Sequence, residues 1–147
     1  MNRLKKEEWW LELAEVAAKR SEDPYCKVGA VAIRPDGSIA AVSYNGAPSK
    51  IEIDWSDRNK RRQFVVHAET NLLRYIKPHE CPNVAVTLAP CYDCLKNLAS
   101  YGIKNIFFKD LYDKCDFEDL KQMANLYKIS LYKYELNQTY NIILTNV

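Results

Sequence analysis

Two short segments contain the side chains that could carry chemistry. The first is His67-Ala68-Glu69, and the second is Pro90-Cys91-Tyr92-Asp93-Cys94. On a helix, Cys91 and Cys94 are three residues apart and therefore share a face. Two thiolates and one imidazole are good zinc ligands, and three protein ligands leave the fourth tetrahedral position open, as in catalytic zinc sites. The spacing thus predicts one Zn²⁺ bound by His67, Cys91 and Cys94.

Both segments are expected to lie at the starts of helices. In a helix interior, residues two apart point in different directions, so His67 and Glu69 can serve one site only in a first turn. There the backbone N–H of Ala68 has no intrahelical partner and is free to donate to a substrate carbonyl. Pro90 suits a helix start, and the positive ends of two helices favour the thiolate forms of both cysteines.

Such a site suits hydrolysis. Zinc lowers the pKa of a bound water from about 16 toward about 7. A carboxylate beside the metal can take the water proton and pass it to a leaving group, and Glu69 is the obvious candidate. Attack of hydroxide on an amidine-like carbon, followed by departure of an amine, is hydrolytic deamination. The sequence therefore predicts a zinc-dependent hydrolase in which Glu69 is catalytic.

The same cysteines also allow other interpretations. A C-x-x-C pair can be redox-active, or it can belong to a structural zinc site in a binding module without catalysis. A structural site needs a fourth ligand, for which the sequence offers Cys26, His79, Cys81 and Cys115. His79 and Cys81 could also contribute to a second metal. The three remaining cysteines could equally be small buried packing residues.

Composition limits the class of protein. The 147 residues carry a formal net charge of +2, with 48% hydrophobic and 27% charged residues. This near balance argues against a protein that mainly coats nucleic acid or an acidic membrane. The five cysteines cannot all pair within one chain, and no apolar stretch predicts a signal peptide or a transmembrane helix. We therefore expect a soluble, cytoplasmic protein with reduced cysteines.

The two segments must be positioned by helices and strands, which composition and periodicity place along the chain. Helices are expected at residues 3–20, 67–76, 91–101 and 117–127, and strands at 28–33, 39–44, 84–88, 103–108 and 130–136. The polar stretch from Ser49 to Arg62 shows no regular periodicity, and long loops of this kind are often functional. The order predicts one α/β domain over residues 1–147, with a mixed sheet flanked by helices.

With these motifs, the sequence resembles the cytidine deaminase superfamily and, within it, the deoxycytidylate deaminase family, over about residues 10–135. The resemblance rests on Arg20-Ser21-Glu22-Asp23-Pro24, Val28-Gly29-Ala30, Ser43-Tyr44-Asn45-Gly46-Ala47-Pro48, Asp54-Trp55 and Thr87-Leu88-Ala89-Pro90-Cys91-Tyr92-Asp93-Cys94. It implies a three-layer α/β/α fold with a mixed five-stranded sheet. It also implies hydrolysis of dCMP to dUMP and ammonia for thymidylate synthesis. Alternative substrates are cytidine, dCTP or a base in RNA.

The resemblance further implies roles for individual residues around the substrate. Ala68 would anchor the base through its N–H, and Val28 would lie under the base. Asn45 would contact the substrate, Ser21 would lie near the 5′-phosphate, and Tyr112 would stack on the cytosine ring.

A regulatory nucleotide is implied as well. It would be dCTP as activator or dTTP as inhibitor, often with Mg²⁺, bound near Tyr44-Asn45-Gly46 in a homohexamer. Ser43 and Glu22 replace the glycine and lysine of the family pattern. The basic run from Arg58 to Arg62 could be a solvated face, a contact for a triphosphate or another subunit, or a nucleic-acid contact.

Overall fold

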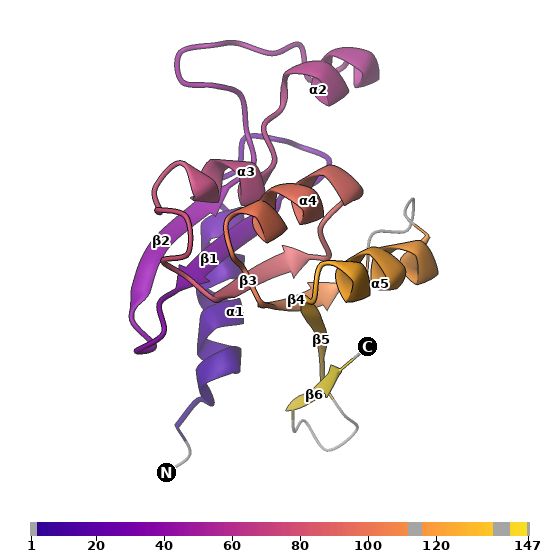
Figure 1. The fold of residues 1–147 in the computed structure, drawn as a ribbon. Coiled ribbons are helices and arrows are strands. Elements are labelled where there is room, and N and C mark those ends of the chain that lie inside the picture. Colours follow the sequence, from indigo (N-terminus) through magenta and orange to yellow (C-terminus); the bar gives the residue numbers. More distant parts are fainter. Residues whose placement is uncertain (1–2, 112–115, 137–141, 147) are drawn as a thin grey trace.

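The computed structural model describes residues 3–111, 116–136 and 142–146, with side chains described as far as residue 135. The helices are α1 (Lys6–Ala18), α2 (Arg58–Phe64), α3 (Ala68–Leu73), α4 (Tyr92–Ser100) and α5 (Phe117–Leu126). The strands are β1 (Gly29–Ile33), β2 (Ile39–Tyr44), β3 (Asn83–Leu88), β4 (Asn105–Asp110), β5 (Ser130–Leu136) and β6 (Ile142–Asn146). Figure 1 shows their arrangement.

The strands form one mixed sheet in the order β2-β1-β3-β4-β5-β6. Strands β3, β4 and β5 are parallel, whereas β1 runs antiparallel to both of its neighbours and β6 runs antiparallel to β5. The five strands expected from the sequence are confirmed. Strand β6 extends the sheet by one strand that the sequence interpretation did not include.

The central strands are buried on both faces, because helices cover each side. In β1, Val31 and Ile33 pack in a cluster with Trp10 of α1, while Ala30 and Ala32 pack in a second cluster with Leu72 of α3. Helix α1 thus covers one face of the sheet, and α3, α4 and α5 lie over the other (Figure 1). The expected three-layer α/β/α architecture is confirmed.

The expectation of an irregular stretch up to Arg62 is wrong, because α2 begins at Arg58. Asp57 caps this helix, since its side chain accepts hydrogen bonds from the N–H groups of Asn59 and Lys60 at 2.9 and 3.2 Å. We call residues 47–65 the insert. Gly46 and Val66 close it at its base through two backbone hydrogen bonds of 2.8 and 3.1 Å.

Within the described part of the chain, no helix combines the length and the apolar character needed to cross a membrane.

Gly29 permits the close contact between α1 and the sheet. A Cβ at this position would lie 1.8 Å from the carbonyl oxygen of Ala14 and 2.6 Å from the amide nitrogen of Ala18. Gly29→Ala should therefore lower the free energy of unfolding by about 3 kcal/mol, measured by urea denaturation.

Gly37→Asn is the matched control for this prediction. Gly37 has a φ of +88° with no atom within 4 Å of its ideal Cβ position, and asparagine tolerates positive φ better than most residues. A loss of stability in Gly29→Ala no larger than that of the control would contradict the predicted clash.

Candidate active site

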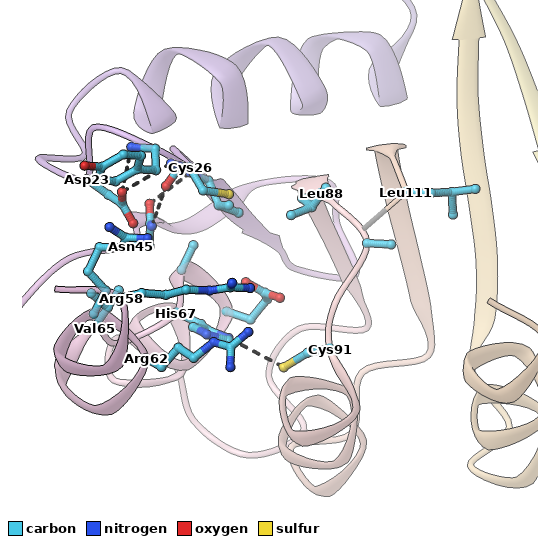
Figure 2. Close-up of a pocket in the computed structure, with 16 residues that line it drawn as sticks. Asp23, Cys26, Asn45, Arg58, Arg62, Val65, His67, Leu88, Cys91 and Leu111 are labelled. Carbon is cyan, nitrogen blue, oxygen red and sulfur yellow. Dashed lines mark hydrogen bonds between the residues drawn. The ribbon is translucent and has the colours of Figure 1, made fainter. Parts of the chain in front are cut away.

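The side chains of His67, Cys91 and Cys94 converge at the starts of α3 and α4. Figure 2 shows His67 and Cys91 beside each other in the cavity. His67 Nδ1 lies 3.5 Å from Cys91 Sγ and 3.3 Å from Cys94 Sγ, and the three ligand atoms all lie within 4.8 Å of one another. Tetrahedral zinc with ordinary Zn–N and Zn–S bonds separates its nitrogen and sulfur ligands by about 3.6 Å. The donor set and its spacing therefore fit one Zn²⁺.

Local backbone conformation aims these side chains beyond the helix ends. His67 and Cys91 are the N-cap residues of α3 and α4, and both have extended backbones, with ψ angles of 152° and 172°. The carbonyl of His67 accepts the first helical hydrogen bond, from Asn71, while its imidazole stays free of the cap. Cys91 caps α4 with its sulfur, which accepts from the N–H of Cys94. The expectation that both motifs begin helices is confirmed.

The two cysteines differ in their protonation chemistry without a metal. Hydrogen bonds from the Cys94 thiol, the His67 ring and the Cys94 N–H lower the pKa of the Cys91 thiol to about 4. The hydrogen bond to Cys91 and burial raise the pKa of the Cys94 thiol. Two neighbouring thiolates need a cation to compensate their charge, so zinc binding would release a proton from this pair of cysteines.

Glu69 occupies the first turn of α3 and borders the same cavity as His67 and Cys91. Its side chain is buried, with the residue only 4% exposed. Burial raises the pKa of its carboxyl to about 7. A carboxyl with this pKa can both accept and release a proton near neutral pH, which is what a proton shuttle requires.

A cavity of about 630 Å³ opens beside these groups, and Val28, Asn45 and Ala68 help to line it. The N–H of Ala68 has no hydrogen-bond acceptor among the described residues. The carbonyl of Ala68 accepts a 2.6 Å hydrogen bond from the buried hydroxyl of Ser43 on β2. This hydrogen bond attaches the first turn of α3 to β2 of the sheet, while the N–H of Ala68 remains free to donate.

Asn45 fixes the shape of the cavity wall through both ends of its side-chain amide. Its Oδ1 accepts from the N–H of Val28 at 2.9 Å, and its Nδ2 donates to the carbonyl of Cys26 at 2.8 Å. Ser21, which is 3% exposed and does not line the cavity, donates its hydroxyl to the carbonyl of Asn45. In this structure Ser21 supports Asn45. The expected stacking residue Tyr112 lies outside the described residues.

The turn expected to bind a regulatory nucleotide, Tyr44-Asn45-Gly46, lies beside the base of the insert. Tyr44 is 37% exposed, and its carbonyl accepts a hydrogen bond from Asn71 of α3 at 2.9 Å. The Glu22 carboxylate accepts from the N–H of Ala47 at 3.4 Å and does not line the cavity. A carboxylate at position 22 therefore faces this turn and leaves the cavity clear. The regulatory role of the turn stays a prediction.

Among the residues that the structure describes, no fourth His, Cys, Asp or Glu side chain joins the candidate metal group. Among the described residues, only His67, Cys91 and Cys94 form such a group of His, Cys, Asp or Glu side chains. None forms around His79 and Cys81 in that part of the chain, and Cys115 lies outside it. Three ligands fit an open catalytic site better than a closed structural one.

Three arginines that line the cavity were not assigned to this site from the sequence. Arg58, Arg61 and Arg62 of α2 line the same cavity as His67, Glu69 and Cys91. A helical signal was present in the sequence, because Asp57 is a good N-cap and the arginines are spaced i, i+3 and i+4. That signal predicts a shared face, but it does not say what the face lies against.

Removal of a metal ligand tests the site directly. His67→Ala, Cys91→Ala and Cys94→Ala should each lose most of the zinc that the wild-type protein retains after desalting, as measured by plasma mass spectrometry. Cys81→Ala is the control. Cys81 is buried away from the cavity, so this variant should keep one zinc per chain. Equal zinc content in all four variants would contradict the assignment.

Comparisons with known proteins agree with this site. Residues 4–110 match the family model described as the cytidine and deoxycytidylate deaminase zinc-binding region. A probable deoxycytidylate deaminase of Caenorhabditis elegans is 35% identical over 131 residues, which are 83% of this chain and 66% of the relative. The chain thus spans just under two thirds of that protein. The deoxycytidylate deaminase of Mus musculus is 31% identical, over 84% of this chain and 74% of the relative.

A solved structure has the same fold. The dCMP deaminase of cyanophage S-TIM5, crystallised with dCMP and dUMP, superposes with a TM-score of 0.73 at 27% identity. The match covers 90% of this chain and 99% of the cyanophage chain. The matched family region includes both metal-binding motifs and the whole insert, so the chain belongs to the cytidine and deoxycytidylate deaminase family.

Proposed function

We propose that this protein hydrolyses dCMP to dUMP and ammonia, using Zn²⁺ bound by His67, Cys91 and Cys94. The observation that carries the proposal is that these three side chains cluster together and that His67, Cys91 and the buried Glu69 line one cavity. The substrate is supported by the names of the worm and mouse relatives and by the nucleotides in the cyanophage structure.

Different residues would bind the substrate and move the proton in this reaction. When bound, zinc would lower the pKa of water from about 16 to about 7. Glu69 takes a proton from the attacking water and delivers it to the departing amine, so that a C–O bond forms as the C–N bond breaks. The free N–H of Ala68 donates to the carbonyl of the base. Val28 and Leu88 give the cavity apolar walls.

Further features are proposed on the family resemblance. The dUMP formed would feed thymidylate synthesis in the cytoplasm. The protein would be a homohexamer that dCTP activates and dTTP inhibits, with the regulatory nucleotide and Mg²⁺ near Tyr44-Asn45-Gly46. The exposure of Tyr44 beside the insert is compatible with such a contact.

A substrate panel tests the reaction and its regulation. The zinc-loaded protein is given dCMP, deoxycytidine, cytidine, dCTP and a short RNA, and ammonia release and the deaminated product are measured. We expect dCMP to have the highest kcat/KM, with dCTP raising and dTTP lowering its turnover. If dCMP is not converted, the proposed reaction is wrong. If conversion occurs without any response to the triphosphates, only the regulatory proposal fails.

The proton shuttle is tested by Glu69→Gln. This change keeps the shape of the side chain but removes its ability to carry a proton, so turnover of dCMP should fall by about 10²- to 10⁴-fold. Zinc content should stay at the wild-type level, because Glu69 is not among the three metal-binding residues. A fully active Glu69→Gln protein would show that another group moves the proton.

A further inference from the structure

Helix α2 presents one face to the catalytic cavity. The residues from this segment that line it are Arg58, Arg61, Arg62 and Val65, which are spaced i, i+3, i+4 and i+7. This is the spacing of a single helical face. Lys60 lies on the same helix, is exposed, and does not line the cavity. The arginines of α2 therefore face the cavity, whereas Lys60, another basic residue of the same helix, does not.

Arg61 holds α2 in place over the cavity. Its guanidinium lies 3.9 Å from the centre of the Tyr25 ring, and its Nη1 donates to the carbonyl of Trp55 at 2.7 Å. Tyr25 lies outside the insert, in the segment that leads to β1, so this cation–π contact joins the insert to the body of the domain. The guanidinium of Arg61 is thus used to hold α2 against the rest of the domain.

The guanidinium groups of Arg58 and Arg62 make no comparable contacts among the described residues. Among the described residues, neither guanidinium has a hydrogen bond or an ion pair, and no acidic side chain there pairs with them. Figure 2 shows both side chains extending from α2 into the same space as His67. Of the two acidic residues that line the cavity, Asp23 already accepts the N–H groups of Tyr25 and Cys26, and Glu69 is buried.

Two like charges four residues apart on a helix repel each other, and a doubly charged anion between them relieves that repulsion. Guanidinium groups match phosphate oxygens with paired N–H donors. The cavity is large enough for a small ligand to reach both the arginines and the metal site, at about 630 Å³. An anion that contacts the arginines while the rest of the ligand enters the metal site is the phosphate of a nucleotide.

We propose that Arg58 and Arg62 bind the 5′-phosphate of the substrate and make the enzyme prefer a nucleoside monophosphate over the free nucleoside. This inference rests on the proposed deamination of dCMP and adds the residues that select the phosphate. It assigns part of the basic run to the catalytic cavity, and it gives phosphate recognition to the insert where the sequence resemblance pointed to Ser21.

The experiment compares dCMP with deoxycytidine, which lacks the phosphate and serves as the reference substrate. In the zinc-loaded protein, Arg58→Gln and Arg62→Gln should each lower the ratio of kcat/KM for dCMP to that for deoxycytidine by about 10- to 100-fold, the loss expected for a hydrogen bond to a charged group. Arg62→Lys, which keeps the charge but not the paired donors, should recover part of the ratio.

Lys60→Gln is the matched control, since it removes one positive charge from the same helix away from the cavity. It should leave the ratio within about twofold of wild type, because exposed charges contribute little over a distance. Binding is measured separately by calorimetry in the Glu69→Gln background, where turnover is suppressed. There, Arg58→Gln should weaken dCMP binding and leave deoxycytidine binding much less affected.

The outcomes separate the two proposals. If wild-type protein does not convert dCMP, the proposed function fails before the arginines are tested. If it does convert dCMP, the inference is overturned when Arg58→Gln and Arg62→Gln keep the wild-type ratio, or when Lys60→Gln lowers it equally. A changed response to dCTP with an unchanged KM for dCMP would also overturn it, because the arginines would then serve a regulatory triphosphate.

Discussion

The rest of the site depends on one cluster, in which two sulfur atoms and one imidazole nitrogen lie within 4.8 Å of one another. Two thiolates this close need a cation between them, and the fold places the three side chains where a single cation can contact them all. The sheet brings the starts of α3 and α4 together, because α4 follows the carboxyl end of β3 and α3 packs across β1 and β2 beside it. The exposed N–H ends of both helices favour negative sulfur. The same first turn of α3 that supplies His67 also supplies the free N–H of Ala68 and the carboxyl of Glu69.

The cavity has two walls with different chemistry. The proposed metal ligands and Glu69 come from the starts of α3 and α4, two helices that pack on the sheet, and of these side chains Cys94 and Glu69 are buried. The opposite wall comes from the insert, which is closed at its base by the pairing of Gly46 with Val66 and attached higher up by Arg61. The proposed deamination chemistry and the proposed phosphate recognition thus lie on separate segments of the chain.

The two residues that depart from the family pattern, Ser43 and Glu22, do not line the cavity. Ser43 sits where the pattern has glycine, and its buried hydroxyl bonds to the carbonyl of Ala68. This contact joins β2 to the first turn of α3, which contains Glu69. Glu22 sits where the pattern has lysine, and its carboxylate meets the N–H of Ala47 outside the cavity lining. A negative charge at this position therefore need not face the phosphate of a substrate.

By itself the sequence predicted the cluster of His67, Cys91 and Cys94, the order of most helices and strands, and the starts of the two helices that carry this cluster. These properties depend on residue type and local spacing, since ligand chemistry, capping and periodicity act over a few residues. It did not determine α2, whose seven residues are too few for a clear periodic signal, nor strand β6. Only the tertiary structure decided that Arg58 and Arg62 share a cavity with His67, and that Ser21 supports Asn45 from behind the wall. Those relations join residues distant in sequence, and they depend on how the insert packs, which no local pattern encodes.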